Sequence, residues 1–143
     1  MEPYRRKAQY YETDMMGVVH HANYAHWMEE ARIDFMDQIG FPYARMEAEG
    51  VISPVVDISV KYLKPCRFGD EIAVSVAVES LSGAKLALRY EMRGISGETV
   101  CIARSEHTFL DRNGRFVRLK REMPAFCEAL ESAMFGSGEQ EQK

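Results

Sequence analysis

The sequence lacks the marks of a membrane-spanning or exported chain. No uncharged run approaches the ~20 residues that a membrane-spanning helix requires, and the first residues carry charge without an apolar segment. Only three cysteines occur, Cys66, Cys101 and Cys127, and no two of them form a C-x-x-C pair. This odd, widely spaced set argues against a disulfide framework or a zinc knuckle and favours a reducing compartment. We therefore expect a soluble, cytoplasmic protein with no membrane insertion.

An excess of positive charge is also missing. The chain has 18 Lys and Arg against 22 Asp and Glu, a net charge of −4, and its basic residues are scattered. Proteins that bind nucleic acid or anionic membranes usually carry a clustered basic face. We therefore expect no nucleic-acid partner, and a small molecule or another protein instead.

Several common catalytic motifs are absent as well. The sequence has no G-x-S-x-G elbow, no G-x-x-x-x-G-K-[ST] phosphate loop and no G-x-G-x-x-G. Cys101 and Cys127 fall in apolar segments, where a cysteine ordinarily serves as a small buried side chain. Cys66, beside Arg67, is less typical, but the same interpretation is favoured for it.

The apolar pattern predicts one domain over residues 1–135, followed by a flexible polar tail at 136–143. Apolar residues recur at helical spacing over 23–39 and then stop at Gly40 and Pro42. A short helical turn at 42–49 and a C-terminal helix at 124–134 are also expected. Alternating patterns predict strands at 56–62, 72–79, 85–93 and 99–110, and 4–11 could add another.

Turn residues between these strands predict how they pair. Ser82-Gly83 and Ser96-Gly97 favour hairpins, so the sheet should be antiparallel. One long helix and several long twisted strands predict an α+β fold with the sheet curled around the helix. Long strand edges need a partner, which favours a homodimer or homotetramer.

The segment ahead of the long helix carries the most chemistry. Asp14 lies among apolar residues, Met15 and Met16 included, where a charge has to be used or compensated. Gly17 allows the backbone to turn sharply. The helix that follows points unpaired N–H groups and a partial positive charge back toward the loop. A carboxylate opposite such donors is half of a hydrolytic site.

Histidines near this loop raise the possibility of a metal site. His20, His21 and His26 could in principle join Asp14, since imidazole and carboxylate suit zinc or iron. His20 and His21 are neighbours that should point in different directions, and none of the spacings is typical of helical ligand pairs. No metal is predicted.

The pattern T-D-x-x-G-V-V-x-H-x-N-Y, followed by W-M-E-E-A-R, resembles the hotdog-fold acyl-CoA thioesterases of the 4-hydroxybenzoyl-CoA thioesterase and YbgC-like group. The resemblance continues into KYLKPCRFGDE, residues 61–71, and covers about residues 4–120. It implies a hotdog fold, a dimer with active sites at the subunit interface, and no metal or redox cofactor. Glu12 and His20 depart from the residues common in the group.

The resemblance also implies roles for individual residues. Asp14 takes the position of the catalytic acid, and the backbone amide of His21 that of the carbonyl-polarising donor. Ser53 would contribute a pocket hydroxyl from the neighbouring subunit, and Glu29 would face the acyl group. The remaining substrate-binding candidates are Gly17 and Tyr24 from the motif, and Lys85 and Arg89, whose charges alternate with apolar positions, for the phosphates of coenzyme A.

These observations predict an enzyme that hydrolyses an acyl-CoA or acyl-carrier-protein thioester to a free acid and a thiol. The histidine at position 21 is typical of the YbgC-like branch and favours an aliphatic or otherwise unspecified acyl group over benzoyl. Two alternatives stay open. One is a hotdog-fold dehydratase of β-hydroxyacyl thioesters, with His21 paired to an acid of the partner chain, and the other is a non-catalytic acyl-thioester binding protein.

Overall fold

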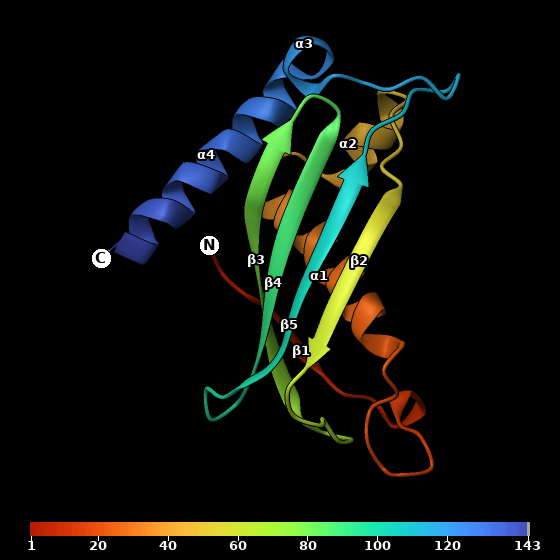
Figure 1. Ribbon diagram of the computed structural model, residues 1–143, viewed down its shortest axis with the longest axis vertical. Coiled ribbons are helices and arrows are strands. Elements are labelled where there is room, and N and C mark those ends of the chain that lie inside the picture. The colour runs from red at the N-terminus through yellow and green to blue at the C-terminus, as the bar shows by residue number, and fades with distance from the viewer. Residues whose placement is uncertain (143) are drawn as a thin grey trace.

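The computed structural model describes the backbone of residues 1–142 and the side chains through Met134 (Figure 1). The helical elements are η1 (Tyr10–Glu12), α1 (Asn23–Gln38), α2 (Tyr43–Ala48), α3 (Leu119–Glu122) and α4 (Pro124–Gln142). The strands are β1 (Tyr4–Lys7), β2 (Val55–Tyr62), β3 (Glu71–Ser82), β4 (Lys85–Gly94) and β5 (Thr99–Thr108). Within residues 1–142, no helix combines the length and apolar content that crossing a membrane requires.

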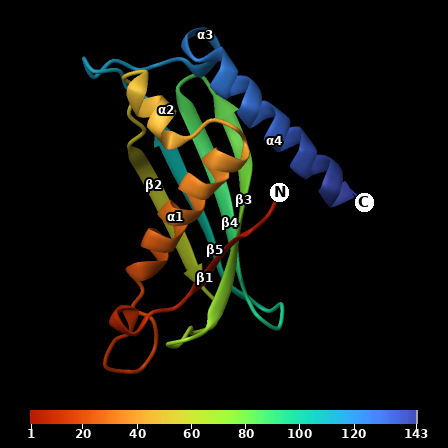
Figure 2. The ribbon, with the colours of Figure 1, turned by 180° about the vertical axis from the view of Figure 1, so that it is seen from behind.

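The five strands form one antiparallel sheet in the order β1-β3-β4-β5-β2. Glycines with positive φ at the hairpin turns, Gly83 (φ 60) and Gly97 (φ 88), connect β3 to β4 and β4 to β5. The strands twist and curl, and α1 lies across the concave face (Figure 2). The α+β class and the sheet curled around one long helix are therefore confirmed.

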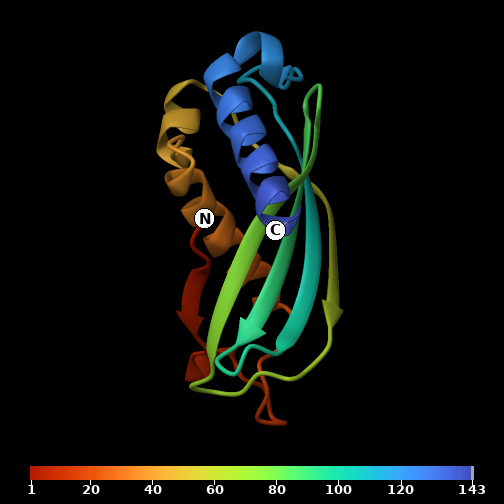
Figure 3. The same ribbon diagram turned by 90° about the vertical axis from the view of Figure 1, so that its left-hand side faces the viewer.

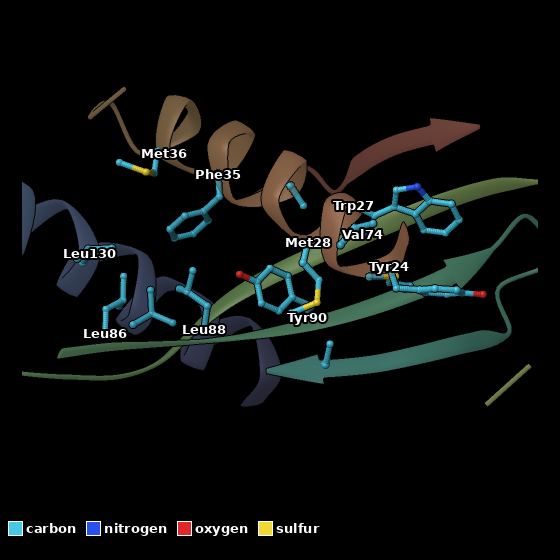
Figure 4. Packing of buried hydrophobic residues seen from close by; sticks show 14 of the residues in the cluster. Tyr24, Trp27, Met28, Phe35, Met36, Val74, Leu86, Leu88, Tyr90 and Leu130 are labelled. Carbon is cyan, nitrogen blue, oxygen red and sulfur yellow. The ribbon is translucent and has the colours of Figure 1, made fainter. Parts of the chain in front are cut away.

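The core forms between α1 and the inner face of the sheet. Trp27, Met28 and Phe35 point from α1 toward the strands, where Leu88 and Tyr90 of β4 meet them (Figure 4). Each of these five side chains is at most 3% exposed. Their spacing along α1 follows the helical period, so the amphipathic pattern directly decides which face of α1 is buried.

The two edges of the sheet are covered to different extents. β1 pairs only with the first third of β3, Glu71–Val74, and α4 lies alongside β3 (Figure 3). At the other edge, β2 pairs with β5 on one side, and no strand of the described residues pairs with its outer side. Val55, Val56 and Ile58 of β2 are 53%, 53% and 45% exposed. β2 is therefore the open, apolar edge of the sheet.

Some elements differ from their expected bounds. The strand expected over 4–11 ends at Lys7, because the chain turns into η1, whose first N–H groups are satisfied by Glu12 and Gln9. The expected C-terminal helix continues past 134 to Gln142. The flexible polar tail expected at 136–143 stays a prediction. The side chains of this segment, and the backbone of Lys143, lie outside the described residues.

Candidate functional site

Asp14 sits in a tight turn ahead of α1. Its N–H donates to the Val18 carbonyl at 2.9 Å, and Gly17 returns a bond to the Asp14 carbonyl at 3.0 Å. Gly17 has φ +78, a conformation that side chains other than glycine rarely adopt. The Asp14 Oδ1 accepts the N–H of Met16 at 2.8 Å, while Oδ2 has no hydrogen-bond partner among the described residues. One carboxylate oxygen is thus held and the other is available.

The turn is fixed to the rest of the fold from both sides. Thr13 pairs with Val19 across the turn, and Val18 pairs with Arg67 of the segment between β2 and β3. The Val19 N–H also donates to the Cys66 carbonyl at 2.7 Å. These bonds hold the half-buried Asp14 on a rigid support, which an acting carboxylate needs.

Met15 and Met16 do not shield Asp14 in a single chain, contrary to what the apolar composition of the loop suggested. Met15 is 104% exposed and Met16 is 78% exposed. The turn that Gly17 closes projects both side chains outward into solvent. Neither methionine therefore shields Asp14 from solvent.

The entry of α1 leaves one peptide N–H without an acceptor. The neighbouring N–H groups are all used: those of His20, Ala22, Asn23 and Tyr24 donate to the Glu12 carbonyl, His20 Nδ1, the His20 carbonyl and the His21 carbonyl. Among the described residues, the N–H of His21 has no such partner. His21 is exposed, and the loop that carries Asp14 leads into the same end of α1. Figure 1 shows this loop ahead of α1.

Tyr62, the last residue of β2, holds the His21 peptide group. Its hydroxyl donates to the His21 carbonyl at 3.0 Å, and its ring meets the edge of Tyr24 at 5.0 Å. Tyr24 is 3% exposed and packs on Trp27 at 4.9 Å. Burial raises the pKa of Tyr24 well above its usual value, so its phenol is neutral. Tyr24 therefore packs beneath Tyr62 as part of the core. A contact between Tyr24 and the substrate stays a prediction.

Glu12 is a buried carboxylate that ties the site to the core. It is 2% exposed and accepts bonds from Arg6 at 2.5 Å, the Gln9 N–H at 2.8 Å and Trp27 Nε1 at 2.9 Å. Burial alone would raise the pKa of Glu12, but these three donors outweigh it and lower the pKa. Its carbonyl also accepts the Asn23 side chain at 2.8 Å. Glu12 thus connects β1, η1 and the start of α1.

The other predicted site residues are not gathered around Asp14 within one chain. Glu29 is exposed on α1. Ser53 and Lys85 lie near Thr108, at the opposite end of the sheet from Asp14: Thr108 donates to the Pro54 carbonyl, and Lys85 pairs with Thr108. Arg89 is exposed in the middle of β4.

The two histidines ahead of α1 lie against each other, and the three cysteines are buried and free. The rings of His20 and His21 stack at 4.2 Å, and no carboxylate hydrogen-bonds to His21 among the described residues. Among all the residues that the structure describes, no three His, Cys, Asp or Glu side chains are arranged to hold a metal ion. Cys66 is 1% exposed, and burial raises its thiol pKa, as expected for a small core residue.

Two residues of the site could not be found from the sequence. In the sequence, Glu12 is noticeable only as a departure from a motif. No pattern in the neighbouring residues indicates that Arg6 and Trp27 donate to it. The alternation of β2 predicts that Tyr62 shares a face with Val60, but its acceptor lies 41 residues away on a separate element. Both residues act through tertiary contacts.

Comparisons with known proteins identify the family of the chain. Residues 9–133 match the model of the thioesterase-like superfamily. YneP of Bacillus subtilis, whose name describes a candidate acyl-CoA thioesterase, is 37% identical over 89% of this chain and 93% of its own length. A Staphylococcus aureus structure described as a DHNA-CoA thioesterase is 34% identical with a TM-score of 0.90, covering 99% of this chain and 95% of that one. The chain therefore belongs to the thioesterase-like superfamily and has its hotdog fold.

Proposed function

We propose that this protein hydrolyses acyl-CoA thioesters, with Asp14 as the acting carboxylate and the His21 amide as the oxyanion donor. One observation carries the mechanism. At one end of α1, a carboxylate oxygen and a peptide N–H in the same hydrogen-bonded loop both have no hydrogen-bond partner among the described residues. Thioester hydrolysis needs these two functions, one to deliver the nucleophile and one to stabilise negative charge.

The two groups act on opposite sides of the same carbonyl carbon. Asp14 Oδ2 either takes a proton from the attacking water or attacks the carbonyl itself. The His21 N–H, at the positive end of the α1 dipole, donates to the carbonyl oxygen as it becomes negative. A well-placed donor of this kind contributes about 3 kcal/mol to the transition state. Collapse of the tetrahedral intermediate breaks the C–S bond and expels the thiolate of coenzyme A. If Asp14 acts as base, the thiolate takes the proton that Asp14 removed from water, and the acid is released. If Asp14 attacks, the acyl group stays on Asp14 as an anhydride, which water hydrolyses to release the acid and supply the proton for the thiol.

A second copy of the chain completes the site in this proposal. The open edge of β2 starts beside Ser53 and ends beside His21, so an antiparallel copy brings Ser53 of one chain toward Asp14 of the other. Lys85 and Arg89, proposed for the coenzyme A phosphates, need the same arrangement, because Lys85 is remote from Asp14 within its own chain.

The proposal also covers the identity of the acyl group and of the carrier to which it is attached. Relatives at 28–29% identity include the YbgC acyl-CoA thioester hydrolase of Escherichia coli and a 1,4-dihydroxy-2-naphthoyl-CoA hydrolase of Thermosynechococcus vestitus. The first supports the YbgC-like assignment and the second an aromatic acyl group. Coenzyme A is the proposed carrier, and a panel of aliphatic and aromatic acyl-CoAs, with one acyl-carrier-protein thioester, separates these possibilities.

The deciding experiment replaces Asp14 with asparagine. Asp14→Asn keeps the shape of the side chain but removes its charge, so kcat for acyl-CoA hydrolysis should fall about a hundredfold or more with little change in KM. A dye that detects the released thiol measures both constants. Circular dichroism checks that the fold is retained.

His21→Ala is the matched control, because it removes the imidazole and keeps the peptide N–H. It should cost much less than Asp14→Asn. Near wild-type thiol release from Asp14→Asn, or a larger loss from His21→Ala, would replace the carboxylate mechanism with a histidine-centred one. Formation of an enoyl-CoA from a hydroxyacyl-CoA, without free thiol, would support the dehydratase.

A further inference from the structure

Arg32 is a buried cation without a carboxylate partner. It lies on the sheet-facing side of α1 and is 7% exposed. Its guanidinium lies 5.9 Å from the centre of the Tyr43 ring, and no carboxylate or hydrogen-bond acceptor pairs with it among the described residues. Burying an unpaired charge is costly, and proteins normally compensate it. Among the described residues, His107 Nδ1 is the only fully buried side-chain nitrogen or oxygen without a hydrogen-bond partner, so the Arg32 nitrogens keep some solvent contact. A bound molecule that carries an acceptor can therefore reach Arg32.

Arg32 borders a small cavity with a second unused polar group. The cavity has a volume of about 10 Å³, room for roughly one water-sized group. Ser53 also lines it, is 9% exposed, and has no hydrogen-bond partner among the described residues. The other lining residues are apolar: Phe35, Met36, Met46, Leu86, Leu88, Phe109, Phe126 and Leu130. The cavity is large enough for one terminal oxygen-bearing group of a ligand, but too small for the apolar remainder of an acyl chain.

The polar groups deeper in the core do not neutralise Arg32. Tyr90, Ser105 and His107 form a buried chain of hydrogen bonds, each 2.7 Å long. Burial, and then the charge of Arg32, lower the pKa of His107 to about 4. His107 is therefore neutral at neutral pH, and Arg32 is the only formal charge among the residues that line the cavity.

Ser53, which forms one wall of the cavity, lies at one end of the open sheet edge, and the Asp14 loop lies at the other. β2 runs between these two ends (Figure 2): Ser53 comes two residues before β2, and Tyr62, its last residue, donates to the His21 carbonyl. If two copies pair antiparallel along β2, Val55 of one lies beside Tyr62 of the other. Ser53 is then only about 7 Å further along the strand direction. The exposed Ile58 lies on the path between the two ends.

We infer that Arg32 and Ser53 of one copy recognise an oxygen at the far end of the acyl group whose thioester is held at Asp14 of the other copy. The substrate class is therefore acyl-CoAs with a terminal carboxylate or a ring hydroxyl. A guanidinium donates strong, charge-assisted bonds to either oxygen, and the Ser53 hydroxyl supplies another. This inference rests on the proposed function and makes Arg32 a specificity-determining residue.

Arg32→Met tests the inference, because methionine keeps most of the apolar volume and removes the charge. Two substrate pairs separate the two kinds of oxygen: 4-hydroxybenzoyl-CoA with benzoyl-CoA, and adipoyl-CoA with hexanoyl-CoA. The wild type should prefer the oxygenated member of at least one pair by about tenfold in kcat/KM. In Arg32→Met this preference should fall to within about twofold through a higher KM, with the unsubstituted member little affected.

Two further variants guard against a purely structural effect. Arg32→Lys should retain part of the preference, because it keeps the charge. Arg45→Met, at an exposed arginine of α2, should leave the preference unchanged. Equal losses on both members of a pair, or no preference in the wild type, would overturn the inference even if unsubstituted acyl-CoAs are hydrolysed. Absence of thiol release from every acyl-CoA would instead contradict the proposed function.

Discussion

At the scale of single residues, the two acids before α1, Glu12 and Asp14, differ in burial and hydrogen bonding, and we assign them different roles. Asp14 has one free oxygen on a half-buried turn, whereas Glu12, two residues earlier, has every local donor directed at it. A fully bonded buried carboxylate stabilises a fold, and a partly free one can react. We therefore assign the chemistry to Asp14 and the stability of the loop to Glu12.

Glu12→Gln should lower the free energy of unfolding by about 2 to 4 kcal/mol, because Arg6 and Trp27 lose their charged acceptor. The pKa of Glu12 is lower in the folded protein than its ordinary value of 4.5. Its contribution is therefore present above pH ~4.5 and is lost as the pH falls through the folded-state pKa. Urea unfolding at pH 7 and at pH 3 measures both effects.

The matched control is Glu49→Gln, which breaks an exposed pair with Arg45 at 3.1 Å. It should cost at most about 0.5 kcal/mol at either pH. If Glu12→Gln were as mild as this control, or if the gap between it and the wild type did not narrow in acid, the role given to Glu12 would be wrong.

At the scale of elements, the site depends on how the end of β2 meets the start of α1. The Tyr62 hydroxyl binds the carbonyl of His21, and the N–H of the same residue is the proposed oxyanion donor. Ala22, at the helix cap, offers no side-chain acceptor, so Tyr62 and the Asn23 side chain hold the first turn. The orientation of the donor is therefore set partly by the sheet.

Tyr62→Phe should lower kcat about three- to tenfold with a stability loss of at most about 1 kcal/mol, since one exposed hydrogen bond is lost. Steady-state kinetics and thermal unfolding separate the two quantities. Tyr4→Phe removes a comparable bond to Glu30 at 2.9 Å, away from His21, and should leave kcat unchanged. Equal effects on kcat from the two variants would contradict a role for Tyr62 in orienting His21.

At the scale of the whole molecule, one sheet edge is covered and the other is open. α4 and β1 cover the edge at β3, and β2 presents eight residues with exposed Val55, Val56 and Ile58. Exposed edge strands of this length are rare in monomers, because they pair with other chains. We therefore propose a homodimer joined along β2, which could pair further into a tetramer.

Light scattering at micromolar concentration should give twice or four times the mass of one chain. Ile58→Arg places a charge on the open edge, so it should shift the protein toward monomer and lower kcat/KM by about tenfold or more. Ile95→Arg, at a residue that is 84% exposed between β4 and β5, is the control and should change neither quantity. A fully active monomeric Ile58→Arg variant would show that the site needs no second copy.

The sequence by itself determined the α+β class with a sheet curled around one helix, the antiparallel pairing of β3, β4 and β5, and the placing of Asp14 and His21 at the entry of α1. These follow from local rules: the period of apolar residues, glycine turns and the polarity of a helix end. The hotdog fold itself was implied by the resemblance of the motif around Asp14 to a known family. Only the tertiary structure decided that Glu12 is buried under three donors, that Arg32 has no carboxylate partner among the described residues, and that Ser53 and Lys85 are remote from Asp14 within one chain. Such facts depend on contacts between elements far apart in the chain, and spacing along the sequence does not encode those contacts.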